Sequence, residues 1–147
     1  MDVIASLDAP ESVQKMYALV RDLATYPNWL DIVHGVQVVE TQPAEDRAWL
    51  VELRGKVGPF ARSKRLRMVR AIDEDPGKVV FERREITGRR NSAWVLTATI
   101  AATATGSNLN VHLHYGGTHF NSYVLERLLA EQISRGSERL LQLLAKN

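Results

Sequence analysis

The hydrophobic residues in the last part of the chain recur with the period of an α-helix. Between residues 121 and 146 they share one face of such a helix, with Gly136 in the middle of that face. At 1.5 Å per residue this helix is roughly 39 Å long, about the width of a small domain. Gly136 indicates either a close contact between the helix and a sheet or space for a ligand beneath the helix. The hydrophobic face consists of Leu125, Leu129, Ile133, Leu140, Leu143 and Leu144.

The start of the chain predicts a strand followed by two short helices. Residues 2–7 alternate as in a half-buried strand. We expect a helix to begin at Pro10 and continue to about Leu23, because hydrophobic residues follow Pro10 with helical spacing. Pro27 interrupts that helix and opens a second one, which ends at Gly35.

From Val36 to Tyr115 the hydrophobic period changes to two, which is typical of β-strands. Short segments rich in Pro, Gly, Asp and Asn separate the alternating runs and predict turns. No interval between turns is long enough for a crossover helix, so we expect sequential, antiparallel strands. The predicted strands cover residues 36–41, 47–57, 62–72, 78–86, 92–103 and 109–115.

These elements predict an α+β fold in a single domain, residues 1–147. Each strand has one more hydrophobic face, and the terminal helix is the large hydrophobic element that can cover it. A curved antiparallel sheet of about seven strands should therefore wrap around the long C-terminal helix, with two short helices after the first strand. A sheet that curves around one helix cannot contact it everywhere, so we expect a ligand pocket between them.

The composition is that of a globular protein, with 45% hydrophobic and 24% charged residues. The chain contains no cysteine, which excludes disulfides and thiolate chemistry. It also has no hydrophobic run of transmembrane length and no signal-peptide pattern at its start. We therefore expect a soluble cytoplasmic protein, either a monomer or a homodimer.

Charge is distributed unevenly along the chain. Residues 1–53 contain three Lys or Arg and nine Asp or Glu, a net charge of −6, whereas residues 54–90 contain twelve and five, a net charge of +7. The basic segment has almost no interleaved aromatic residues, so we expect no nucleic-acid binding. An outer sheet face with cross-strand ion pairs, including Arg65 and Arg67, explains the basic segment. A transient contact with an anionic membrane during ligand loading is the other interpretation.

Residues 19–29 read Leu-Val-Arg-Asp-Leu-Ala-Thr-Tyr-Pro-Asn-Trp. Together with the order of the predicted elements, this run resembles the START-like (SRPBCC, helix-grip) superfamily, in the branch of polyketide cyclase/dehydrase, lipid-transport and coenzyme Q-binding proteins. The resemblance implies a helix-grip fold whose deep cavity holds lipids, quinones, polyketides or other apolar molecules. The residues that match the pattern are Val20, Asp22, Tyr26, Pro27 and Trp29.

A ligand in the expected pocket would contact the inward-facing residues of the strands and the terminal helix. Aromatic rings among them give an apolar ligand a large contact area with little loss of rotamer entropy. The alternative is that these side chains fill the core. The predicted ligand-binding residues are Trp29, Trp49, Leu53, Met68, Phe81, Arg83, Trp94, Tyr115, Phe120, Leu129 and Ile133.

Arg83 and Glu85 form the polar pair of greatest interest. If Phe81 faces inward, both share its face, and charges on a hydrophobic wall must be paired or reach water. Arg83 is then either an anchor for a carboxylate, phosphate or carbonyl of the ligand or part of an ion pair at the strand end. If Val80 and Ile86 face inward instead, the pair lies on the outer face.

His112 and His114 share one strand face, and His119 follows shortly after. Strand histidines two positions apart can bind zinc, but the alternation turns this pair toward water, and no Asp or Glu is close in the sequence to complete a site. We therefore expect no metal and no cofactor. The familiar hydrolase, metalloprotease and nucleotide-binding motifs are also absent.

The sequence thus predicts binding or transport of a small hydrophobic or amphipathic molecule, such as a lipid, quinone or polyketide-like compound. The alternative, which the resemblance implies, is a polyketide cyclase or aromatase in which Arg83 anchors the substrate and Tyr115 or Ser92 transfers protons. A third interpretation is a protein-interaction module that uses the charged outer face of the same fold.

Overall fold

The computed structural model describes residues 2–54, 63–88, 91–116 and 122–146. The chain begins with strand β1 (Asp2–Ala9), helix α1 (Val13–Val20) and the 3₁₀-helix η1 (Leu23–Asn28). The next elements are β2 (Val33–Val39), β3 (Ala48–Leu53), β4 (Lys64–Glu74), β5 (Lys78–Arg83), β6 (Ala93–Ala102) and β7 (Ser107–Gly116). Helix α2 (Ser122–Lys146) follows.

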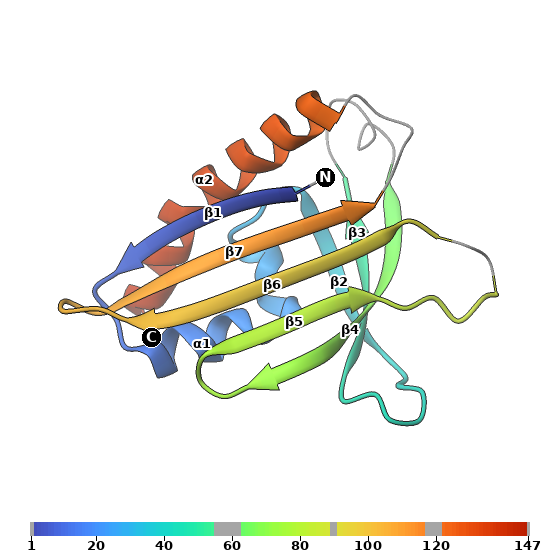
Figure 1. The fold of residues 1–147 in the computed structure, drawn as a ribbon, viewed down its shortest axis with the longest axis horizontal. Coiled ribbons are helices and arrows are strands. Elements are labelled where there is room, and N and C mark those ends of the chain that lie inside the picture. The colour runs from blue at the N-terminus through green and yellow to red at the C-terminus, as the bar shows by residue number, and fades with distance from the viewer. Residues whose placement is uncertain (1, 55–62, 89–90, 117–121, 147) are drawn as a thin grey trace.

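The seven strands form one sheet in the order β1-β7-β6-β5-β4-β3-β2 (Figure 1). Consecutive strands from β2 to β7 pair antiparallel, as the alternation predicts, and β1 pairs with β7. β1 and β2 are therefore the two edges of the sheet. The predicted α+β fold, with a curved antiparallel sheet and a long C-terminal helix, is confirmed.

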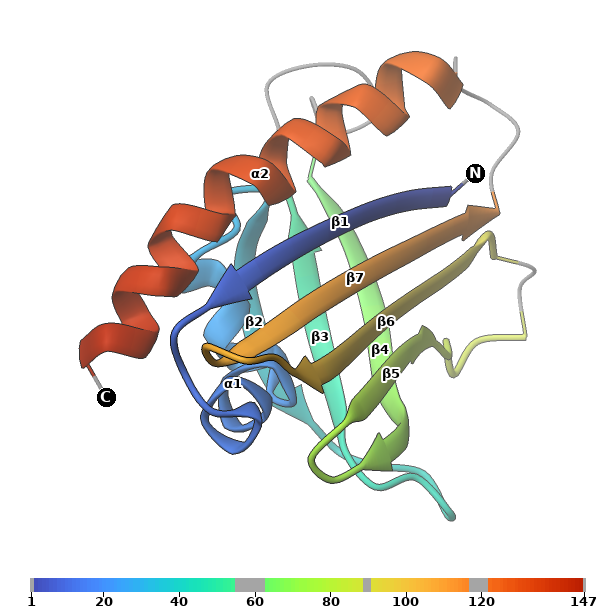
Figure 2. The same ribbon diagram turned by 60° about the vertical axis from the view of Figure 1, so that its left-hand side comes forward.

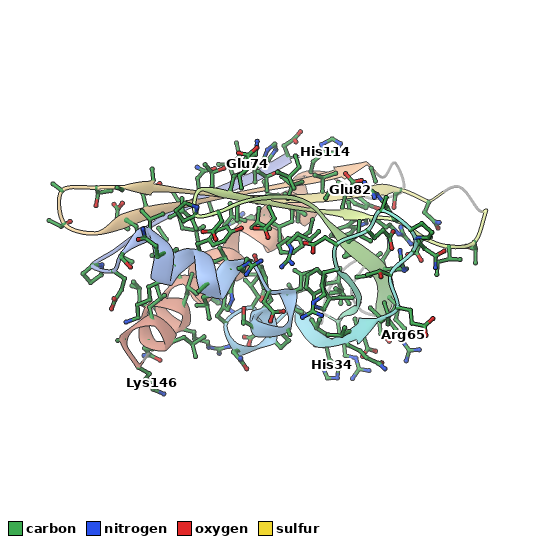
Figure 3. The ribbon with its side chains drawn as sticks, turned by 90° about the horizontal axis from the view of Figure 1, so that it is seen from below. His34, Arg65, Glu74, Glu82, His114 and Lys146 are labelled. Carbon is green, nitrogen blue, oxygen red and sulfur yellow. The ribbon has the colours of Figure 1, made fainter. Side chains whose placement is uncertain are left out.

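The helices that the structure describes all lie on one side of the sheet, and α2 runs beside β1 (Figures 2 and 3). On the opposite side Glu74, Glu82 and His114 point away from the helices (Figure 3). The sheet therefore has an inner face that packs on the helices and an outer face that meets water. Within the described part of the chain, no helix is both long enough and hydrophobic enough to cross a membrane.

The predicted start of the first helix is wrong by three residues. β1 extends to Ala9, which pairs with Ser107 of β7, so Pro10 belongs to the connection and not to the helix. The helix begins at Val13 because the Oγ of Ser12 accepts a hydrogen bond from the backbone N–H of Lys15, at 3.2 Å. This side chain satisfies one of the free amides of the first turn.

The second short helix also begins earlier than predicted. Asp22 caps η1 by accepting a hydrogen bond from the backbone N–H of Ala24, at 2.9 Å, and Pro27 lies inside η1 instead of opening a helix. The segment from Val33 to Gly35, predicted as the end of a helix, is already part of β2. Val33 pairs with Leu53 of β3, and this long-range pairing overrides the local helical pattern.

Strict alternation through residues 62–72 predicts that Ile72 shares one face with Leu66 and Met68, and the structure contradicts this prediction. The pairing of β4 with β5 shifts by one residue between Arg70 and Ile72. Such a shift moves the following side chains to the other face of the sheet. Ile72 is consequently 39% exposed, whereas Leu66 is 2% exposed.

Arg67 is the clearest correction on the outer face. Arg65 is exposed opposite Glu52, as expected, but Arg67 is only 5% exposed. Its guanidinium donates to both carboxylate oxygens of Glu45, at 2.5 and 3.0 Å, and to the backbone carbonyl of Glu40, at 3.0 Å. Arg67 therefore fastens the β2–β3 connection onto the sheet and is not available to a partner.

Gly136 marks a close contact and not a space for a ligand. A Cβ at position 136 would clash with the backbone carbonyl of Trp29 and lie 3.0 Å from Cδ2 of Leu30. The contact is made with the connection between η1 and β2 and not with the sheet itself. Gly136 therefore allows a close contact, as the first interpretation predicts, but its partner is this connection and not the predicted sheet.

Candidate ligand-binding cavity

An apolar cavity of about 90 Å³ lies between the inner face of the sheet, η1 and α2. One water molecule needs roughly 10–15 Å³ in such a measure, so the core is incompletely filled here. Among the described residues that line it, Gln132 of α2 is the exception to an otherwise hydrophobic set. The lining residues are Leu23, Tyr26, Leu30, Ile32, Val33, Val51, Leu53, Leu66, Met68, Trp94, Leu96, Val111, Leu113 and Gln132.

The strand alternation and η1 place these side chains. Val51 of β3 pairs with Leu66 of β4, so both project from the same inner face. η1 brings Leu23 and Tyr26 over that face, and the Tyr26 hydroxyl donates to the backbone carbonyl of Val20, at 2.9 Å. Burial raises the pKa of Tyr26, so its hydroxyl stays neutral and its hydrogen bond holds the ring in place.

Of the predicted ligand-binding residues, Leu53, Met68 and Trp94 line the cavity. Tyr115 of β7 lies directly opposite Trp94, and their ring centroids are 4.7 Å apart. The aromatic pair stands on the inner face of β6 and β7, at the end of the sheet where β7 approaches Gly116. Phe120 lies outside the described residues, as do the side chains of Leu129 and Ile133.

Three other predicted aromatic residues pack into the core beside the cavity. Trp29 lies 4.8 Å from the Tyr26 ring, centroid to centroid, and Phe81 lies 6.1 Å from Tyr26 and 5.5 Å from Trp49. Phe81 is fully buried, whereas Ile86 is 65% exposed. Phe81 pairs with Leu96 of β6, which lines the cavity, so Phe81 and Arg83 both belong to the inner face.

Arg83 is held by groups of the protein itself. Its Nε donates to Oε1 of Glu85, at 3.0 Å, and its Nη1 lies 3.2 Å from the backbone carbonyl of Ser92. The same oxygen of Glu85 accepts the backbone N–H of Arg67, at 3.0 Å. The structure thus places Arg83 in an ion pair at the strand end, the arrangement that was the alternative to a ligand anchor.

Lys64, which the sequence placed only within the basic segment, lies beside the cavity. Its Nζ is 5.5 Å from the Trp94 ring centroid and 5.6 Å from that of Tyr115. Burial, together with the positive charge of Arg83, lowers the pKa of Lys64. The strand alternation could have predicted this position, because Lys64 lies two residues before Leu66 and therefore faces inward with it.

A second pocket, of about 340 Å³ and polar, lies between the end of α1 and strands β3 and β4. Arg70 covers the Trp49 ring, at 5.7 Å from its centroid, and donates to Asp46, at 2.7 Å. Arg21 donates to Asp73, also at 2.7 Å. Arg21 and Arg70 are both paired with carboxylates, so they add no unpaired charge to this pocket. The Arg21–Asp73 pair also connects the end of α1 to β4.

The histidine pair lies on the outer face, as predicted, but one reason given against a metal site is wrong. Asp2 of β1 pairs with His114, and its Oδ1 lies 2.9 Å from His114 Nδ1 and 2.8 Å from His112 Nε2. The sequence alone does not predict that Asp2 lies beside the histidines, because β1 and β7 are far apart in the chain. The described residues include no group of three or more ligands arranged to hold a metal ion.

A curved antiparallel sheet that leaves an apolar cavity against a long C-terminal helix defines the helix-grip class of proteins. The sequence model of the family described as polyketide cyclase/dehydrase and lipid transport matches residues 3–147. The chain therefore belongs to this family. No curated protein sequence matches this one.

Solved structures share the fold at low sequence identity. A START superfamily protein from Mycobacterium smegmatis superposes with a TM-score of 0.76 at 11% identity, covering 99% of this chain and 97% of the other. A protein from Thermus thermophilus gives 0.76 at 16% identity, covering 99% and 98%. The di-domain ARO/CYC StfQ from the steffimycin biosynthetic pathway gives 0.68 at 16% identity, covering 99% of this chain and 50% of the di-domain chain.

Proposed function

We propose that this protein binds and carries a small hydrophobic or amphipathic molecule in the cavity between the sheet and α2. The observation that carries the proposal is the apolar cavity, with its lining drawn from η1, several strands and Gln132 of α2. Ligand carbon that replaces water there contributes about 25 cal/mol per Å² of apolar surface removed from water. Family membership supports a ligand-binding role in general.

The experiment that tests this function is native mass spectrometry of the protein purified from its own source. We expect a bound molecule that survives desolvation and is identified after extraction. Leu113→Trp should abolish its retention, because Leu113 lines the cavity and a larger ring would occupy the space. Ile4→Trp is the matched control, since Ile4 is 66% exposed. A folded Leu113→Trp variant that retains the molecule would contradict the proposal.

A second candidate function is polyketide cyclisation, which the description of the family and the similarity to an ARO/CYC protein favour. Arg83 and Ser92 would then act together, since Arg83 Nη1 lies 3.4 Å from Ser92 Oγ. Carrier function is preferred because the described cavity wall has one hydroxyl, that of Tyr26, and it is engaged by the Val20 carbonyl. Turnover of a poly-β-keto thioester that Ser92→Ala abolishes would establish the cyclase instead.

A further inference from the structure

Lys64 directly adjoins the wall of the apolar cavity. It pairs with Leu53 of β3 and precedes Leu66 by two positions on β4, and both leucines line the cavity. Side chains two residues apart in a strand project from the same face, so the Lys64 side chain leaves the sheet on the cavity side. Trp94 provides a second link, because it lines the cavity and lies 5.5 Å from Lys64 Nζ.

The positive charge of Lys64 lies against two aromatic rings. Trp94 is 4% exposed and Tyr115 is 4% exposed, so the ammonium group lies against a buried aromatic pair. Within residues 2–54, 63–88, 91–116 and 122–146, no described carboxylate oxygen is within 4.0 Å of Lys64 Nζ. A half-buried ammonium of this kind is stabilised by an anion brought by a ligand.

Arg83, a second described cation whose charge acts on Lys64, does not need such an anion. Glu85 accepts a hydrogen bond from Arg83 Nε at 3.0 Å and neutralises its charge. The carbonyl and hydroxyl oxygens of Ser92 accept hydrogen bonds from Arg83 Nη1. Among the described residues, the cations Lys64 and Arg83 and the carboxylate of Glu85 therefore leave a surplus of one positive charge here. One surplus charge suits a carboxylate, whereas a dianionic phosphate would leave a negative charge uncompensated in apolar surroundings.

On the basis of the proposed ligand-binding function, we infer that the ligand is an apolar molecule ending in a carboxylate, and that Lys64 binds this carboxylate. The hydrocarbon part occupies the cavity below Trp94 and Leu66. The carboxylate lies at the Lys64 end, where the ammonium donates hydrogen bonds to it and Arg83 adds a longer-range attraction.

The test compares decanoate with decan-1-ol, which have the same chain length and differ in the charged end. Titration calorimetry gives the dissociation constant of each probe for the wild type and for Lys64→Met. We expect the variant to lose roughly ten- to a hundredfold in affinity for decanoate, since hydrogen bonds to charged groups have this magnitude. Its affinity for decan-1-ol should change by less than about threefold, because the methionine stem preserves the apolar contacts.

Two further variants separate a binding role from a structural one. Lys64→Arg should restore the preference for decanoate, because it retains the charge. Arg65→Met removes a cation from the adjacent position on the exposed outer face of β4 and should behave as the wild type. Lys64→Met that weakens both probes equally, or neither, overturns the inference and leaves the carrier function standing. A wild type that binds neither probe overturns both.

Discussion

The close approach of α2 to the connection between η1 and β2 depends on a single glycine. Gly136→Ala should lower the free energy of unfolding by roughly 1–3 kcal/mol, because the new methyl group would clash with the Trp29 carbonyl and press on Leu30. Helix propensity alone predicts the opposite sign, a gain of about 1 kcal/mol. Urea denaturation followed by circular dichroism measures the difference.

Ser134→Ala is the control for this experiment, since Ser134 is exposed on the same helix. It should leave stability unchanged or raise it by a few tenths of a kcal/mol, about the difference in helix propensity. A stabilised Gly136→Ala variant would show that α2 does not pack as closely on Trp29 as the structure indicates.

The buried pair of Glu45 and Arg67 predicts a pH dependence of stability. The hydrogen bond from Arg67 lowers the pKa of Glu45 from its ordinary 4.5 to about 2. The folded protein thus binds the Glu45 proton less tightly than the unfolded chain, so the stabilisation is complete above pH 4.5 and is lost as the pH falls toward 2. Glu45→Gln should lower stability by about 2–3 kcal/mol at neutral pH and by progressively less in acid.

Glu52→Gln serves as the comparison for Glu45→Gln. Glu52 pairs with Arg54 at 3.4 Å, and the Arg54 side chain is 52% exposed. Exposed pairs contribute about 0–1 kcal/mol, so this variant should change stability little. Equal losses for the two variants, or a loss for Glu45→Gln that does not shrink between pH 4.5 and 2, would refute the role assigned to the buried pair.

Loss of the helix cap should affect ligand affinity differently for α1 and η1. Asp22→Ala removes the cap of η1, and Ser12→Ala removes the cap of α1, each lowering stability by about 1 kcal/mol. η1 supplies Leu23 and Tyr26 to the cavity wall, whereas none of the described cavity-lining residues belongs to α1. Ligand affinity should therefore fall in Asp22→Ala and remain unchanged in Ser12→Ala.

Calorimetric titration of both cap variants with decan-1-ol, beside their urea melts, measures affinity and stability separately. Equal affinities at equal loss of stability would mean that η1 positions no cavity residue through its cap. The uncharged probe keeps this outcome independent of Lys64.

For the whole molecule, the incompletely filled core predicts that stability depends on the ligand. A ligand at one hundred times its dissociation constant adds about 2.7 kcal/mol to the free energy of unfolding. For a chain of 147 residues this corresponds to a rise in Tm of roughly 5–10 °C. Thermal melts before and after extraction of the co-purified molecule measure the shift, and re-addition should restore it. An extracted protein with an unchanged Tm would contradict a ligand-filled cavity.

Much of this architecture follows from the sequence alone. The spacing of hydrophobic residues changes from a period of two to a period of 3.6, which predicts a row of antiparallel strands followed by a terminal helix. Each period places the hydrophobic side chains of an element on one face, where they can pack in a common core. The same alternation places Leu53, Met68 and Trp94 on the inner face, where the structure finds them in the cavity wall. The turn at Asp75, Pro76 and Gly77 likewise separates β4 from β5.

Only the tertiary structure decided which residues meet across the chain. Lys64 and Trp94 are far apart in sequence and become neighbours because β4 and β6 both face the cavity. Asp2 lies beside His114 because β1 pairs with β7 at the edge of the sheet. Arg67 is buried because the β2–β3 connection folds over it. Local periodicity determines the face of each side chain, but the partners on that face depend on strand order and long-range register, which no short window of sequence contains.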